Sequence, residues 1–275
     1  MAEPDSLDTS SIAEVGCADA PVVRVSGASY VRGGYRSFEF VDVSVRAGQV
    51  AVLLSGERSF ARDLLLAVAG AVRPTSGSIA VGGAEFTAST GKGAAALRVG
   101  AAWSRFQRQL RAASAVGLGV FTGLTEVDES LTVEEVVARE LTHRRSARAE
   151  APDALDYLAS FGFATYADQR IERLHPDARA RLSAALALAP APCVAVVDLR
   201  DPFCAGLTAA EERAVVSDLR DVARATGAAI LLCCSEASSS AEADAVFALD
   251  IAATEELSAV DSISAIQPVS EGVDA

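Results

Sequence analysis

The segment from Val50 to Gly70 has the pattern of a strand, a turn and a helix that could bind phosphate. Val50–Leu54 is a continuous apolar run that predicts a buried strand, and Ser55–Ser59 is a polar turn with one glycine. The apolar residues that follow predict a helix ending near Gly70. Phosphate-binding proteins use this unit to direct backbone N–H groups and a lysine at a nucleotide. The turn lacks the lysine, so the sequence predicts the scaffold without the residues that would hold a phosphate.

A carboxylate follows a second apolar run further along the chain. Cys193–Val197 predicts a buried strand, and Asp198 comes directly after it. Open α/β sheets bind their ligands at the carboxyl ends of their strands. Asp198 is therefore a candidate for the chemistry of this chain.

The elements that would position these residues belong to an α/β fold. Residues 22–31 and 38–50 alternate apolar and polar side chains as antiparallel strands do, with Arg32-Gly33-Gly34 as the turn. Later segments alternate between predicted helices (Ala101–Ser114, Leu131–Leu141, Asp177–Leu188, Ala209–Ala225) and predicted strands (Val116–Phe121, Ala228–Cys234, Ala245–Asp250). This order predicts an antiparallel N-terminal β portion and a mainly parallel core sheet.

Two of the predicted helices have further features. Leu131–Leu141 should begin with a capping box made by Thr132 and Glu135. Ala101–Ser114 is amphipathic, with Trp103, Phe106 and Leu110 on one side and Arg105, Arg108 and Arg111 on the others. A basic amphipathic helix can contact an acidic partner, whereas a solvated helix face is the simpler interpretation.

Composition and charge exclude several classes of protein. Among 275 residues, 51% are hydrophobic, which is ample for a buried core. The longest apolar run, Ala184–Val197, is broken by two prolines, and the acidic N-terminus lacks the features of a secretory signal. We therefore expect a cytoplasmic protein with no direct membrane insertion. A net charge of −13 argues against nucleic acid and anionic lipid as partners.

The cysteines are scattered along the chain. Their spacing matches neither a disulfide framework nor a metal site, so we expect reduced core thiols and no bound metal. They are Cys17, Cys193, Cys204, Cys233 and Cys234.

Several short segments have the order and spacing of a known family. AGAVRPTSGSIAVGG (Ala69–Gly83), LTVEEVV (residues 131–137) and AGLT (Ala205–Thr208) follow the strand-turn-helix unit in that order. Over roughly residues 21–252, the sequence resembles the nucleotide-binding subunit of ATP-binding cassette (ABC) transporters. The resemblance implies a P-loop NTPase-like ABC ATPase fold with a helical subdomain at about residues 125–185. Residues 1–20 would be a disordered acidic lead-in, and residues 253–275 an acidic tail.

The resemblance also implies cofactors and partners. ATP and Mg²⁺ are the cofactors of the family, and its partners are a membrane-spanning transporter subunit and a second ABC subunit. Such partners would hold the chain at the inner face of the cell membrane. Tyr30 lies where the family stacks adenine on an aromatic ring, although an ordinary strand tyrosine would also explain it.

The phosphate loop of the family is altered here at each functional position. Ser55 and Phe60 replace its glycines, Ala61 replaces its lysine, and Arg62 and Asp63 replace its Ser/Thr pair. Phenylalanine and alanine neither let backbone N–H groups approach phosphates nor supply a positive charge. The positional equivalents of the cofactor-binding loop are Ser55, Gly56, Glu57, Arg58, Ser59, Phe60, Ala61, Arg62 and Asp63.

The sequence makes specific predictions for Arg62, Asp63 and Ser59 of this loop. Arg62 stands one position beyond the lysine, and a helix step of about 100° disfavours its acting in the lysine's place. Asp63 would repel a nucleotide's phosphates, or else stabilise an empty helix end through the macrodipole, with Ser59 as a candidate N-cap.

The resemblance assigns two carboxylates to catalysis. It also shows that further functional residues of the family are replaced in this sequence. Asp198 retains the position that supports Mg²⁺, and Asp201 becomes a surrogate base if the alignment has a two-residue insertion. Four other functional positions of the family are altered, namely the glutamine (Thr122-Gly123), the LSGGQ signature (Leu174–Ala178), the catalytic glutamate (Leu199) and the switch histidine (Glu236).

These losses together should abolish hydrolysis, because phosphoryl transfer depends on positioning and electrostatics. The leading hypothesis is an ABC transporter ATP-binding subunit that is degenerate in ATP hydrolysis and acts as a structural or regulatory partner of a membrane transport complex. One alternative is an active ABC ATPase subunit of an asymmetric pair that powers export. Another is a soluble adaptor on an ABC fold.

Overall fold

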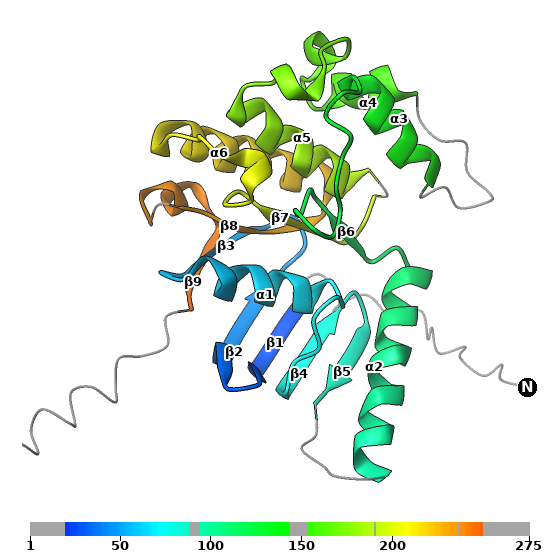
Figure 1. Cartoon of the computed structure of the whole chain (residues 1–275), viewed down its shortest axis with the longest axis vertical. Coiled ribbons are helices and arrows are strands. Elements are labelled where there is room, and N and C mark those ends of the chain that lie inside the picture. The colour runs from blue at the N-terminus through cyan, green and yellow to red at the C-terminus, as the bar shows by residue number, and fades with distance from the viewer. Residues whose placement is uncertain (1–19, 89–93, 144–152, 190, 236, 250–275) are drawn as a thin grey trace, which may run out of the picture.

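Two β-sheets with one helix between them form the centre of the fold (Figure 1). The computed structural model describes residues 20–88, 94–143, 153–189, 191–235 and 237–249. The acidic lead-in, the acidic tail and Glu236 therefore lie outside the described residues. The helix between the sheets, α1 (Arg58–Val68), contacts strands of both.

The first sheet is antiparallel and has the strand order β2-β1-β4-β5. Its strands are β1 (Val23–Arg32), β2 (Tyr35–Val45), β4 (Ser76–Val81) and β5 (Ala84–Thr87). The β1–β2 turn lies at Gly33 and Gly34, which both have positive φ. Helix α2 (Ala94–Ala112) packs beside β5, where Trp103 and Phe106 contact the ring of Phe86.

The second sheet is parallel and has the strand order β6-β7-β8-β3-β9. Its strands are β6 (Val116–Leu118), β7 (Val194–Asp198), β8 (Ala229–Cys233), β3 (Val50–Leu54) and β9 (Ala245–Ala248). Every residue of β7 and β8 is buried. Both faces of this sheet are covered, as parallel sheets require, which explains why these strands are apolar throughout.

Different layers cover the two faces of the parallel sheet. Val50 and Val52 of β3 pack toward the helical side, whereas Ala51 and Leu53 pack toward α1 and the antiparallel sheet. The helices of the first side are α3 (Val133–His143), α4 (Ala154–Ser160), α5 (Pro176–Leu188) and α6 (Ala209–Thr226). Short 3₁₀ turns occur at Ala164–Tyr166, Ile171–Arg173, Pro202–Cys204 and Ala237–Glu242.

The predicted elements are present, but most of their ends differ by one to three residues and the start of α2 differs by more. Helix α1 begins at Arg58, inside the predicted turn, and β6 ends at Leu118 rather than at Phe121. Helix α2 begins at Ala94, within a Gly- and Ala-rich stretch that has no apolar period. The predicted capping box is confirmed, because the Thr132 N–H donates to Glu135 Oε2 at 2.8 Å and the Glu135 N–H to Thr132 Oγ1 at 3.2 Å. In the described part of the chain, no helix is both long and apolar enough to cross a membrane.

Candidate functional site

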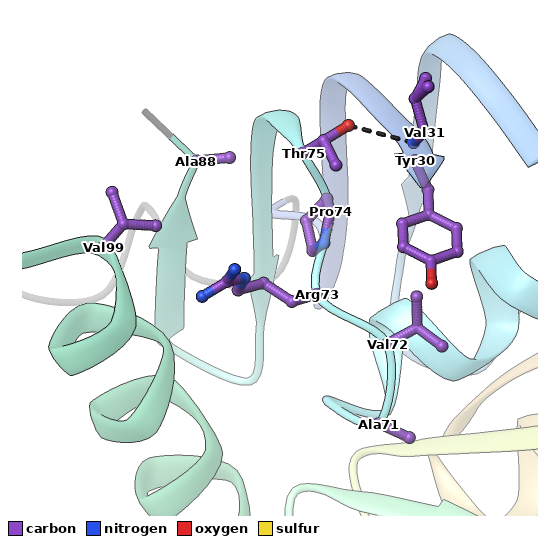
Figure 2. Close-up of a pocket in the computed structure, with 9 residues that line it drawn as sticks. All are labelled: Tyr30, Val31, Ala71, Val72, Arg73, Pro74, Thr75, Ala88 and Val99. Carbon is purple, nitrogen blue, oxygen red and sulfur yellow. Dashed lines mark hydrogen bonds between the residues drawn. The ribbon is translucent and has the colours of Figure 1, made fainter. Parts of the chain in front are cut away.

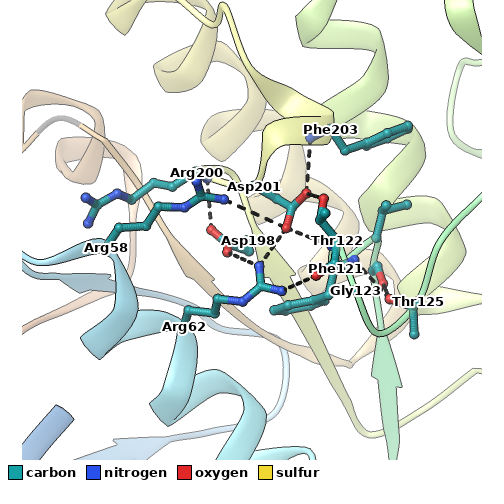
Figure 3. Close-up of polar contacts among 12 residues, drawn as sticks. Arg58, Arg62, Phe121, Thr122, Gly123, Thr125, Asp198, Arg200, Asp201 and Phe203 are labelled. Carbon is teal, nitrogen blue, oxygen red and sulfur yellow. Dashed lines mark hydrogen bonds and ion pairs between the residues drawn. The ribbon is translucent and has the colours of Figure 1, made fainter. Parts of the chain in front are cut away.

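The carboxyl ends of three parallel strands converge with the N-terminal part of α1 (Figure 3). Asp198 ends β7, and Asp201 lies in the loop that follows it. Thr122 lies in the loop after β6, and Arg62 lies on α1, which follows β3. Because these strands are parallel, their ends meet at one edge of the sheet, which brings the four side chains together.

The guanidinium of Arg62 is the centre of this cluster. Its Nη1 lies 2.6 Å from Asp201 Oδ2 and 3.2 Å from Asp198 Oδ2, and its Nη2 donates to the Thr122 carbonyl oxygen at 2.7 Å. Its carbon centre also lies 5.2 Å from the ring centroid of Phe121. The side chain of Arg62 is 20% exposed, whereas both carboxylates are fully buried. A cation from the chain itself thus pairs with two buried acids.

Asp201 also joins the loop after β6 to the loop after β7. Thr122 donates to it twice, from its N–H to Oδ2 at 2.9 Å and from its hydroxyl to Oδ1 at 2.5 Å. The Phe203 N–H donates to Oδ1 at 3.1 Å. Burial alone would raise the pKa of Asp201, but the hydrogen bonds from Thr122, Phe203 and Arg62 outweigh it and lower the pKa. A carboxylate with a lowered pKa is a weaker base, which disfavours Asp201 as a general base.

Asp198 has donors on both of its oxygens. Oδ2 faces Arg62, and Oδ1 accepts from the Arg200 N–H at 2.9 Å and from the Cys233 thiol at 2.7 Å. Burial and the neighbouring Asp198 raise the pKa of Cys233, so this thiol keeps its proton and remains a donor. The side chain of Arg200 reaches across to the Ser55 carbonyl oxygen at 2.8 Å.

The structure changes the expectations for three residues of the loop. Arg62 was not expected to take the lysine's place, and its guanidinium instead reaches the carboxylates of Asp198 and Asp201. Ser59 as N-cap is wrong, because the N-cap residue is Glu57, which makes no side-chain capping bond. Asp63 is wrong as a first-turn acid, because it is the sixth residue of α1.

The remaining loop residues lie around a pocket next to the cluster. Glu57, Arg58, Ser59, Arg62, Thr122 and Pro202 line this pocket, which has a volume of about 410 Å³. Arg58 Nη2 is 3.9 Å from Asp201 Oδ2. Of the other loop positions, Ser55 and Phe60 are partly buried, Gly56 is exposed and Ala61 is fully buried.

Tyr30 lies in a different pocket (Figure 2). This pocket has a volume of about 530 Å³, and its other residues come from β1, the segment Ala71–Thr75, the end of β5 and α2. The Tyr30 ring also lies 6.2 Å from that of Phe38, as in an ordinary strand packing contact. The structure thus divides the predicted cofactor-binding residues between two pockets.

The other altered family positions have structural roles in the described chain. His175 is the N-cap of α5, and its Nδ1 lies 2.8 Å from Asp177 Oδ1. Leu199 is buried with 2% exposure. Thr208 caps α6 through a capping box with Glu211.

Sequence reasoning did not find Thr122, Arg200 or Cys233 as parts of the site. Thr122 was noted only as the place of a missing glutamine, although the ends of adjacent parallel strands bring it next to Asp201. Thr122 could have been predicted as a site residue if β6 and β7 had been recognised as neighbouring strands. Cys233 ends β8 beside Asp198, so the same reasoning applies.

Solved structures with a similar fold include ATP-binding cassettes. CbiO1 from Clostridium perfringens, part of the ABC transporter complex cbiONQ, gives a TM-score of 0.63 at 18% identity over 84% of this chain and 85% of that one. A nucleotide-free ATP-binding cassette from an ABC transporter gives 0.61 at 15% identity over 88% and 95%. The dimeric cassette MJ0796 in a post-hydrolysis state, bound to ADP and Pi, gives 0.60 at 14% identity over 82% and 94%.

Sequence comparison finds no matching family model and no matching curated protein. At such low identities, the likeness to solved structures concerns the fold. This chain has the fold of an ABC ATP-binding cassette, as the resemblance predicted.

Proposed function

We propose that this chain is an ABC-type ATP-binding subunit that has lost ATP hydrolysis. It acts as a structural or regulatory partner of a membrane transport complex. The observation that carries the proposal is the position of Arg62, whose guanidinium lies between α1 and the carboxylates of Asp198 and Asp201. A nucleotide with its metal would have to bind at this edge of the sheet.

The residues at this edge do not suit Mg²⁺. Oδ2 of Asp198 and Oδ2 of Asp201 are both within hydrogen-bonding distance of Arg62 Nη1. A divalent cation bound there would lie against a guanidinium, with strong repulsion in a poorly solvated site. The buried Ala61 supplies no charge to a phosphate, and the buried Leu199 cannot act as a base.

The experiment is equilibrium binding of ATP with and without Mg²⁺, together with an ATPase assay. We expect no saturable binding up to about 1 mM ATP, because no lysine and no metal site would hold the phosphates. Arg62→Ala, which frees the two carboxylates, is a useful comparison. Magnesium-dependent hydrolysis by the wild-type chain that Asp198→Asn abolishes would disprove the proposal.

The membrane partner is a separate part of the proposal. CbiO1 is described as part of a transporter complex, and this chain shares its fold. We expect the chain to be retained by a membrane-spanning subunit at the inner face of the cell membrane, in pull-down from detergent-solubilised membranes. Recovery of wholly soluble partners would favour an adaptor role instead.

The alternative function, an active ABC ATPase subunit of an asymmetric pair, fits the residues at positions 174–178 less well. Such a subunit would offer backbone N–H groups at residues 174–178 to its partner's nucleotide. Pro176 has no N–H, and Asp177 adds a negative charge that pairs with Arg181. Titration of ATP into mixtures with a competent cassette would test this alternative.

A further inference from the structure

One face of α2 carries a row of arginines, which we call the basic face. It consists of Arg98, Arg105, Arg108 and Arg111, all of which are exposed. At about 100° and 1.5 Å per residue, the four lie within an arc of about 140° and extend over about 20 Å of the helix. Helix α2 has 19 residues and no aspartate or glutamate among them.

The opposite face of α2 is already used by the fold. Trp103, Phe106 and Leu110 are buried, and the Trp103 ring lies 4.8 Å from that of Phe86 on β5. Between the arginines, the outward positions are small or polar, such as Ala101, Ser104 and Gln109. At these positions the basic face therefore offers charged and polar side chains to a partner.

The arginines of the basic face have no acidic partner among the residues that the structure describes. Arg108 donates only to the Ser104 carbonyl oxygen of its own helix, at 3.4 Å. The closest strand, β5, has one acid, Glu85, which alternates with the buried Phe86 and so points to the other face of its sheet. Elsewhere, arginines such as Arg181 and Arg224 are paired with acids.

The charge balance makes this face exceptional in the chain. Four arginines and no acid give α2 a formal charge of +4, so the rest of the chain carries −17 against −13 for the whole. Arg73 adds a further cation nearby, because it extends toward the α2 side of the pocket that it shares with Val99 (Figure 2). A concentrated positive field on an acidic protein selects its partner by charge.

We propose that the basic face is a docking surface for an acidic segment of a partner protein. A narrow polypeptide can follow the row of arginines without approaching the acidic remainder of the molecule. A membrane or a nucleic acid is a broad anionic surface, which that remainder would repel.

The test is fluorescence anisotropy with fluorescein-labelled deca-glutamate as the probe and the full chain as the binder. At about 50 mM NaCl we expect saturable binding, which weakens as salt screens the charges. Replacing the four arginines by glutamine (R98Q/R105Q/R108Q/R111Q) should weaken binding by about tenfold or more. This variant should keep its melting temperature, because surface changes away from contacts are nearly neutral.

The matched control removes the same charge from exposed arginines elsewhere, as R24Q/R139Q/R173Q/R213Q. It should bind the peptide within about twofold of the wild type, because those arginines are dispersed. Equal weakening in both variants, or no binding by the wild type, would show that the basic face is only a solvated surface. Tighter binding to vesicles with about 25% phosphatidylserine, or to a DNA duplex, than to the peptide would also overturn the proposal.

Discussion

Arg62 decides what the candidate site can do, because it pairs a cation from the chain itself with two buried carboxylates. Separating charges from water is unfavourable, and only close pairing offsets it. The 2.6 Å contact with Asp201 and the 3.2 Å contact with Asp198 meet that requirement. The site is thereby complete as an ion-pair network, which distinguishes it from a site that awaits a metal.

We expect Arg62→Ala to lower the free energy of unfolding by about 3–5 kcal/mol, because it removes the cation beside Asp198 and leaves Asp201 only the more distant Arg58, at 3.9 Å. Urea denaturation at neutral pH measures this loss. The double variant R62A/D201N should lose less than the sum of its single variants, because the two side chains interact directly. Exposed Arg213→Gln is the control and should change stability by less than about 0.5 kcal/mol. A loss below about 1 kcal/mol for Arg62→Ala would contradict the network.

Asp201 gives the site a defined pH dependence. Its pKa is lower in the folded chain than the ordinary value of 3.8, so its stabilisation is complete above that value and is lost as the pH falls through the folded pKa. Asp201→Asn should cost about 3 kcal/mol at pH 7 and progressively less below about pH 4. Urea unfolding across this range measures the difference. The exposed Asp168→Asn is the control, and a deficit of D201N that stays constant with pH would refute the role of the carboxylate.

At the scale of elements, apolar patterning predicted most helices and strands and the α/β class, whereas the ABC fold was predicted from the resemblance. The continuous run of β3, the alternation in β1 and β2 and the capping box of α3 follow from local rules of burial and hydrogen bonding. The start of α1 does not, because Arg58 and Ser59 suit a turn or a helix equally. The long-range contacts of the Arg62 side chain with Asp198 and Asp201 do not follow from apolar patterning either, which is why the site was predicted less well than the fold.

A substitution at Gly77 tests how much stability depends on the close approach of β4 to the irregular part of β1. Its φ is +76°, and a Cβ there would lie 2.3 Å from the Gly27 carbonyl oxygen, so Gly77→Ala must displace backbone. We expect a loss of about 3 kcal/mol or more in urea unfolding. Gly33→Ala is the matched control, because its φ is +59° but the space around it is open, so only about 1 kcal/mol should be lost. Equal losses would mean that φ alone matters.

At the scale of the whole molecule, the Arg62 network joins parts of the chain that lie on different sides of the parallel sheet. Helix α1 lies between the two sheets, whereas the loop after β6 leads to α3 on the helical side (Figure 1). In that loop, the carbonyl oxygen of Thr122 accepts a hydrogen bond from Arg62, and the N–H of Thr122 donates one to Asp201. These hydrogen bonds come from the chain itself, so they hold the loop after β6 against α1 whether or not any ligand is present.

Amide hydrogen exchange measures how strongly Arg62 stabilises the loop after β6. In Arg62→Met, which keeps the bulk of the side chain but removes its charge, Asp201 loses the closer of its two arginines and Thr122 loses the donor to its carbonyl oxygen. We expect amide exchange at residues 121–126 to become about tenfold faster or more, while the β1–β2 ladder, which has its own hydrogen bonds, keeps its protection. If exchange rose equally in both regions, Arg62 would contribute only to global stability. An unchanged rate at residues 121–126 would show that the bridge between Phe121 and Thr125 holds the loop without Arg62.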